Sequence, residues 1–178
     1  EHMLFEGQTI LVQVIKDPIN SKGARLSTQI SLAGRFLVYL PQDDHIGISQ
    51  RIEDEEERNE LRARLKALLP ENAGGYIIRT SAETARDEEL QADIDYLSKL
   101  WQDILARSKT SPAETMLYQD LPLSLRVLRD MFNGNTQKIF VDSANNYRLM
   151  QEFARQYVQG AVECIQHYQG EKPLFELH

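Results

Sequence analysis

The short apolar segment Gly74–Thr80 constrains the fold of this chain more than any other stretch. Residues 76–78 are aromatic or β-branched and follow two glycines, which predicts a short buried strand. Arg79 and Thr80 come directly after it. A guanidinium presents a planar fork of donors and a hydroxyl adds another, so this strand end is suited to bind a phosphate. The alternative is a strand end at which Arg79 pairs with a surface carboxylate.

Helical patterns flank this strand on both sides. Residues 54–68 begin with an acidic run, which favours a helix start, and carry leucines at helical spacing. Residues 87–107 show the same spacing over a longer stretch. Residues 35–40 and 47–52 predict further strands before the first helix. The central part of the chain is therefore predicted to be an α+β unit, with a small mixed sheet and flanking helices. The segment 108–112 is the clearest break after it.

The N-terminal part predicts a two-stranded ribbon. Residues 8–16 and 25–32 read as strands, the second with clean alternation of apolar and polar side chains, and a basic loop at 17–23 joins them. A two-stranded ribbon is marginal in water by itself, so these strands need more sheet or a partner surface.

The last third predicts a strand–helix–strand unit. A short strand at 116–118 and a helix at 122–132 lead to a strand at 138–141, a helix at 144–158 and a strand at 161–168. This order indicates a βαβ crossover. A further helix is expected to begin at 174 and to be cut off at the end of the chain.

Composition limits the function classes. The formal net charge is −7 and the pI is about 5.1, whereas a general nucleic-acid binder is normally basic. Six acids lie within residues 53–60, so any anion site must be local. The single cysteine, Cys164, excludes an internal disulfide and a multi-cysteine zinc site, and it suits a reducing cytoplasm. No apolar run approaches the length needed to cross a membrane.

Motifs for catalysis are not found in the sequence. The four histidines lie outside the common metal-binding spacings, and there is no phosphate-binding glycine loop. Asp142, at a strand end, is the one candidate for a nuclease-like metal site, but such a site needs several converging carboxylates. Capping of the helix at 144–158 is the favoured role for Asp142. We therefore assign no catalytic residue and no metal ligand.

Five segments taken together resemble the bacterial ribonuclease E/G family, with its ribonuclease G branch nearer than its ribonuclease E branch. They cover nearly the whole chain in the family's order and are residues 22–38, 47–52, 75–80, 138–142 and 167–175. The resemblance implies three parts: the last strands of an S1 (OB-type) barrel at 1–33, a 5′-sensor region at 34–116, and a truncated RNase H-like α/β subdomain at 117–178.

The same resemblance implies a site. Arg79 and Thr80 match the pair that binds the 5′-monophosphate of RNA, and Gly34 and Val38 match positions that contact the terminal nucleotide. Arg51 matches a basic position near that pocket, where the preceding Gln50 replaces a second arginine of some relatives.

The resemblance also implies what this chain leaves out. The family's catalytic domain, with its magnesium-binding aspartates, and the zinc link between subunits would both lie beyond His178. The expected fragment binds 5′-monophosphorylated single-stranded RNA in the bacterial cytoplasm, belongs to a homo-oligomeric endoribonuclease of rRNA and mRNA processing and decay, and is itself inactive. Two alternatives stay open: a structural scaffold that binds no RNA by itself, and a metal nuclease built around Asp142.

Overall fold

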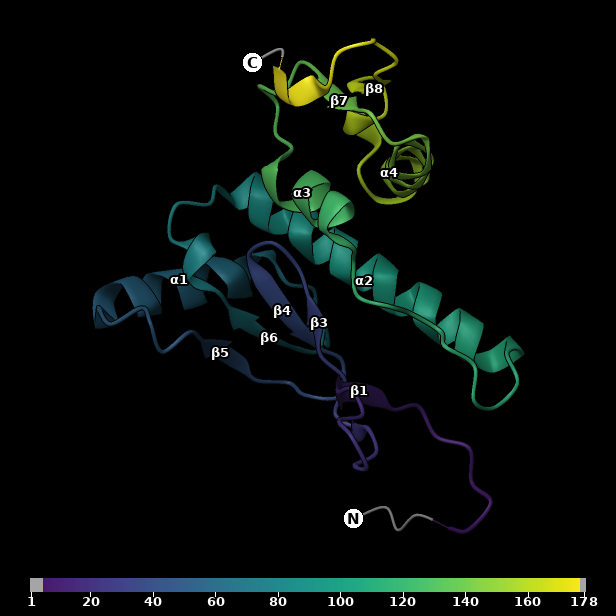
Figure 1. The fold of residues 1–178 in the computed structure, drawn as a ribbon. Helices are drawn as coiled ribbons and strands as arrows, with labels where there is room; N and C mark the ends of the chain where they lie inside the picture. The colour runs from purple at the N-terminus through teal and green to yellow at the C-terminus, as the bar shows by residue number, and fades with distance from the viewer. Residues whose placement is uncertain (1–4, 177–178) are drawn as a thin grey trace. The chain divides into compact units, whose positions relative to one another are not determined.

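The computed structural model describes residues 5–176 and confirms the predicted α+β class (Figure 1). The chain divides into two compact units, Glu1–Tyr118 and Gln119–His178. The described part of the first contains a two-stranded and a four-stranded sheet, and that of the second contains a two-stranded sheet. Residues 1–4 of the predicted S1 part and the last two residues of the predicted final helix lie outside the described part. Leu174–Glu176 forms a single 3₁₀ turn, η3.

A four-stranded mixed sheet organises the first unit. Its strands are β3 (Leu32–Ala33), β4 (Leu37–Leu40), β5 (Ile46–Ile48) and β6 (Gly75–Ile78), in the order β3-β4-β6-β5. The segment singled out from the sequence, now β6, is a central strand. It pairs antiparallel with β4 and parallel with β5.

One face of this sheet is buried and the other is only partly covered. Leu37, Tyr76 and Ile78 are almost inaccessible to solvent, whereas Val38 and Ile77, which pair with each other on the opposite face, are half-buried. The helices α1 (Glu55–Leu68) and α2 (Asp87–Thr110) lie along the sheet and contribute leucines and isoleucines to the same core (Figure 1). Asp54 caps α1 by accepting from the N–H of Glu57.

The predicted ribbon is shorter than expected. It consists of β1 (Gln13–Lys16) and β2 (Arg25–Ser27), paired antiparallel with an irregular register after Val14. The expected strand at 25–32 breaks because polar side chains compete with the ladder. The N–H of Gln29 donates to Ser27 Oγ, and the N–H of Ser31 donates to Gln13 Oε1. The chain then continues into β3, which belongs to the other sheet.

The second unit contains the predicted βαβ crossover. β7 (Ile139–Val141) and β8 (Ile165–His167) are parallel, and α4 (Ala144–Tyr157) connects them. α3 (Leu123–Met131) packs on α4. The described part of this unit has nine buried apolar residues: Leu121, Leu125, Leu128, Val141, Met150, Phe153, Ala154, Ala161 and Ile165. The expected strand at 116–118 does not form. The expected strand at 161–168 is limited to β8 because a 3₁₀ turn, η2 (Gln159–Ala161), precedes it.

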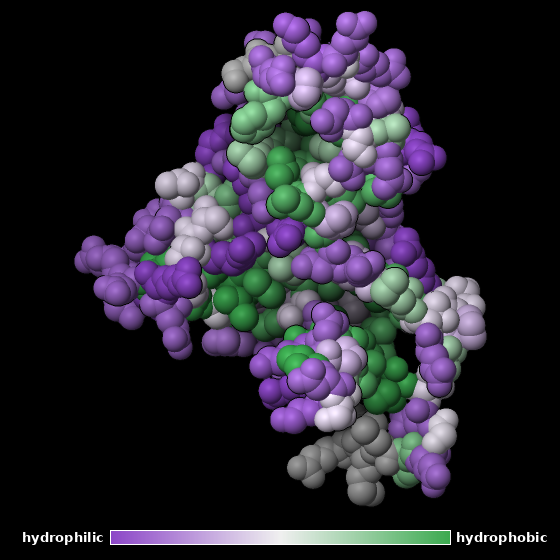
Figure 2. Space-filling view, viewed as in Figure 1, coloured by the Kyte–Doolittle hydropathy of each residue, from purple (hydrophilic) through white to green (hydrophobic). Residues whose placement is uncertain are grey.

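Hydrophobic side chains reach the surface in both units. Figure 2 shows green, hydrophobic surface in the regions of β1 and of α3, where Val14, Leu123 and Met131 are more than half exposed. None of the helices in the described part of the chain is long and apolar enough to span a bilayer.

Candidate anion-binding site

Three segments that are far apart in sequence meet at one end of the four-stranded sheet. β5 and β6 are parallel, so residues 49–51 and 79–81, which follow them, leave the sheet at the same edge. β4 runs the other way, so the loop 34–36 that precedes it starts at that edge too. Main-chain hydrogen bonds join the three: Ser49 N–H donates to Ile78 O at 2.8 Å, and Arg79 N–H donates to Phe36 O at 2.9 Å.

Arg79 is held by the loop before β4. Its Nη1 donates to the carbonyl oxygens of Gly34 and Arg35. No ion pair among the described residues includes Arg79, and its Nε and Nη2 have no hydrogen-bond partner there. The pairing of Arg79 with a surface carboxylate, considered from the sequence, is therefore not seen. One edge of the guanidinium fixes its direction while the remaining donors stay available to an anion.

Hydroxyl groups lie next to Arg79 along the chain. Thr80 opens a 3₁₀ turn, η1 (Thr80–Ala82), and is half-buried. Ser81 Oγ donates to Arg35 O at 2.8 Å, so this hydroxyl tightens the loop before β4. Thr80 Oγ1 makes no hydrogen bond to another described residue, which leaves it as the hydroxyl of the pair that can turn toward a ligand.

Gly34 and Val38 are brought to the same end of the sheet as Arg79. Gly34 is buried, and its carbonyl receives the Arg79 bond. Val38 lies on the partly covered face, in register with Ile77 of β6, whose other neighbour is Gly47 of β5. This row leaves an apolar surface beside the Arg79–Thr80 corner.

Arg51 lies in the turn that begins beside this corner. Its side chain is exposed, and among the described residues it has no ion-pair partner. The turn is fixed by Arg58 of α1, whose Nη1 donates to Ser49 O at 3.0 Å and Ile52 O at 2.9 Å. Gln50, also exposed, occupies the neighbouring position.

Two contributors to this site were missed from the sequence. Arg58 is given no role in the site from the sequence, but in the structure it ties the 49–52 turn to α1 and pairs with Glu55 at 3.5 Å. Asp93 was not singled out at all, although its carboxylate accepts three N–H bonds from the loop before β4. A signal existed for Asp93, because it falls beside Ile94 on the apolar stripe of α2, where a carboxylate needs a reason to be buried.

Arg35 and Glu89, near the loop before β4, already have partners. Arg35 lies over the Phe36 ring, 4.6 Å from its centroid, and 3.9 Å from Glu89. The main-chain N–H of Arg86, which donates to Glu89, is the main reason that the pKa of Glu89 lies below its ordinary value. Burial raises the pKa of Tyr76, so its phenol stays neutral beneath the sheet. Among the described residues at this edge, Arg79 is thus the cation whose direction is fixed by hydrogen bonds but which has no carboxylate partner.

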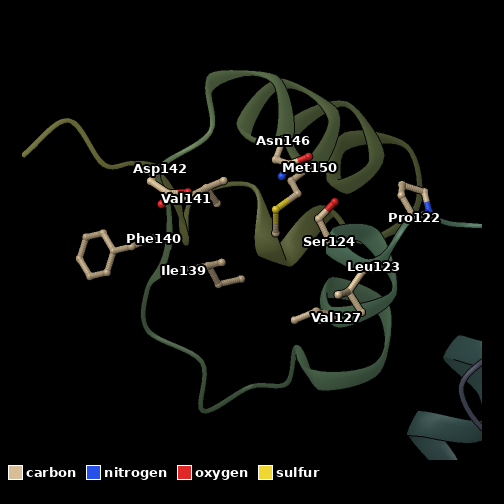
Figure 3. Close-up of a pocket in the computed structure, with 10 residues that line it drawn as sticks. All are labelled: Pro122, Leu123, Ser124, Val127, Ile139, Phe140, Val141, Asp142, Asn146 and Met150. Carbon is tan, nitrogen blue, oxygen red and sulfur yellow. The ribbon is translucent and has the colours of Figure 1, made fainter. Parts of the chain in front are cut away.

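A hollow lies in the second unit. It has a volume of about 490 Å³ and lies between α3, β7 and α4, with a mainly apolar lining and three polar residues, Ser124, Asp142 and Asn146 (Figure 3). The described part of the chain contains no group of three or more His, Cys, Asp or Glu side chains placed to hold a metal. The predicted capping role of Asp142 is wrong: Ser143 caps α4, because its Oγ accepts from Asn146 N–H at 3.3 Å and its backbone is in the capping conformation.

Comparison with known proteins extends over nearly the whole chain. A model of the ribonuclease E/G family matches residues 31–178. Ribonuclease G of Salmonella typhimurium (strain SL1344) is 40% identical over 99% of this chain and 36% of its own length. Ribonuclease G of Haemophilus influenzae is 42% identical over 99% of this chain and 36% of its own.

The other branch of the family is also matched. Ribonuclease E of Nostoc sp. is 34% identical over 98% of this chain and 26% of its own length. The chain thus spans about a third of the length of the ribonuclease G proteins that it matches. The family model covers well over half of the chain, and the five segments quoted from the sequence, apart from the start of the first, lie inside the match. The chain belongs to the ribonuclease E/G family.

Proposed function

We propose that this chain binds single-stranded RNA at its 5′ end, with Arg79 and Thr80 holding the terminal monophosphate. The observation that carries the proposal is the state of Arg79. Its guanidinium is directed by two main-chain carbonyls and has no carboxylate partner among the described residues. A guanidinium that is already oriented, has free donors and lies next to a hydroxyl is preorganised to bind an external anion.

A terminal monophosphate suits this corner better than an internal diester. It carries a charge of about −1.5 to −2 at neutral pH and three accessible oxygens, whereas a diester carries one charge and two free oxygens. Arg51, exposed at the neighbouring turn, adds positive charge. The half-buried row of Val38 and Ile77 offers an apolar surface for the first nucleotide, and the main chain of Gly34 borders it.

The rest of the proposal concerns the parent protein. We infer that the chain is a part of a homo-oligomeric endoribonuclease that processes and degrades rRNA and mRNA in the bacterial cytoplasm. The relatives named ribonuclease G and ribonuclease E, which are much longer, support this inference. In this proposal the magnesium-dependent cutting centre and the zinc link between subunits belong to other parts of the parent.

The test compares matched RNA ends. The 178-residue chain is titrated with one single-stranded oligomer carrying either a 5′-monophosphate or a 5′-hydroxyl, at one fixed salt concentration because salt alone shifts such affinities. The wild type should prefer the phosphorylated end by about tenfold or more, since a hydrogen bond to a charged group contributes about 1.5–3 kcal/mol and tenfold corresponds to 1.4 kcal/mol.

Variants locate the site. Arg79→Ala and Thr80→Val should lose most of the preference, and Arg79→Lys should weaken it because a point charge does not reproduce the guanidinium fork. Arg126→Ala, which removes an exposed arginine of the second unit, is the matched control and should keep it. A wild type without any preference would favour the scaffold alternative. A preference that survives in both Arg79→Ala and Thr80→Val would place the pocket elsewhere.

A further inference from the structure

The buried carboxylate of Asp93 organises the loop that holds Arg79. Asp93 lies on α2 and is only 6% exposed. Its Oδ1 accepts from Arg35 N–H at 2.9 Å, and its Oδ2 accepts from the N–H groups of Phe36 and Leu37 at 2.8 and 2.9 Å. Three consecutive main-chain donors therefore converge on one carboxylate, which offsets the cost of removing its charge from water.

The same peptide groups face Arg79 with their other side. The peptide group that joins Gly34 to Arg35 donates its N–H to Asp93, and its carbonyl, that of Gly34, accepts from Arg79 Nη1. In the next two peptide groups, the N–H groups of Phe36 and Leu37 donate to Asp93. The carbonyl of Arg35 accepts from Arg79 Nη1 and Ser81 Oγ, and the carbonyl of Phe36 accepts from Arg79 N–H. A continuous hydrogen-bonded chain thus runs from Asp93 through the loop 34–37 to the guanidinium. Bonds in such a chain polarise one another, so the loss of one end weakens the rest.

The Asp93 carboxylate leaves no room for a side chain at position 34. A Cβ at position 34 would lie 2.5 Å from both carboxylate oxygens of Asp93. The backbone of Gly34 is not in the left-handed region, so conformational freedom is not what selects glycine here. The absence of a side chain lets the loop close over the carboxylate.

We propose that Asp93 is a positioning residue of the 5′-phosphate site. It sets the direction of Arg79 through the loop 34–37, and it is the reason that position 34 must be glycine. This inference rests on the proposed function for its consequence in RNA binding, but the link between Asp93 and Arg79 can be measured without RNA.

The RNA experiment uses Asp93→Asn. An amide places a donor where Oδ1 accepts, so the Arg35 N–H loses its acceptor while the shape is kept. Measured below the thermal transition of the variant, the ratio of affinities for 5′-phosphate and 5′-hydroxyl RNA should fall about tenfold toward unity. The affinity for 5′-hydroxyl RNA should change less than twofold. Asp95→Asn removes the same charge from an exposed position on the same helix and should leave the ratio unchanged.

The RNA-free experiment is NMR of ¹⁵N-labelled protein. In Asp93→Asn, the Nε–Hε resonance of Arg79 and the amide resonances of residues 35–37 should move together, and those amides should exchange faster with solvent. An unchanged Arg79 resonance would overturn the proposal even if binding fell. If wild-type protein shows no preference for the phosphorylated end, the proposed function fails, and the NMR result alone decides whether Asp93 positions Arg79.

A double-mutant cycle of positions 34 and 93, measured by melting temperature, tests the steric part of the proposal without the Asp93→Asn variant. Gly34→Ala should lower the melting temperature strongly in the wild type but much less in an Asp93→Ser background, because the shorter side chain makes room for the new Cβ. Equal losses in both backgrounds would mean that Asp93 is not what excludes a side chain at position 34, and would overturn that part of the proposal.

Discussion

The Nη1 group of Arg79 donates to the carbonyl of Gly34, a residue 45 positions earlier in the chain. This bond joins the end of β6 to the loop before β4, and it explains why an arginine at a strand end can be directed without a carboxylate. The edge of the sheet where both segments lie also receives the turn after β5. Much of the site's geometry therefore depends on contacts between main-chain groups and side chains from distant positions, and these contacts can be tested one at a time.

The first prediction concerns Arg58. Arg58→Ala should lower the free energy of unfolding of the first unit by about 1–3 kcal/mol, because the carbonyls of Ser49 and Ile52 lose a charged donor. The loss is measured by urea denaturation with a probe in the first unit. Arg126→Ala, at an exposed position, should change stability by less than about 0.5 kcal/mol. An equal loss in both variants would contradict the anchoring role of Arg58.

The second prediction concerns pH and Glu89. Its pKa is lowered in the folded state, chiefly by the main-chain N–H of Arg86 and then also by the Arg86 side chain. A carboxylate with a lowered folded pKa contributes stability above its unfolded pKa, near 4.5, and this contribution is lost as the pH falls through the folded value. Wild type should therefore exceed Glu89→Gln in stability at pH 6–7, and the gap should close toward pH 3. A gap that stays constant over this range would show that another property of Gln is responsible.

The third prediction concerns the N-terminal ribbon. The apolar side chains of Val14 and Leu26 are each 54% exposed, whereas Tyr76 and Ile78 of β6 are 1% exposed. The amides of β1 and β2 should therefore exchange with deuterium before those of β6, since few buried contacts oppose their opening. Hydrogen exchange with mass spectrometry measures both segments in one sample. Uniform protection of the ribbon and β6 would show that the ribbon is part of the cooperative core.

The fourth prediction is that the isolated chain does not cleave RNA. Purified protein is incubated with magnesium or manganese and a 5′-monophosphorylated single strand. No product is expected, because the proposal places the cutting centre in another part of the parent. Cleavage that follows the protein through purification and disappears in Asp142→Asn would instead support a metal nuclease built around Asp142.

The sequence by itself determined the four helices, the two central strands of the four-stranded sheet and the family. The apolar run at 36–40, the aromatic and β-branched run before Arg79 and the helical spacing of 87–107 are local patterns, so β4, β6 and α2 were predicted near their observed positions. The identity of the strand-end residues also followed from sequence, since Arg79 and Thr80 are adjacent in the chain.

Only the tertiary structure decided what surrounds those residues. The carbonyl partners of Arg79, the role of Arg58 at the 49–52 turn and the burial of Asp93 involve residues that approach one another only when the sheet and helices pack. A periodic pattern predicts which face of a helix is buried. It does not predict which main-chain N–H groups, distant in sequence, will donate to a carboxylate on that face. The sequence therefore assigned no role to Asp93, and only the fold shows it to be the acceptor for three loop N–H groups.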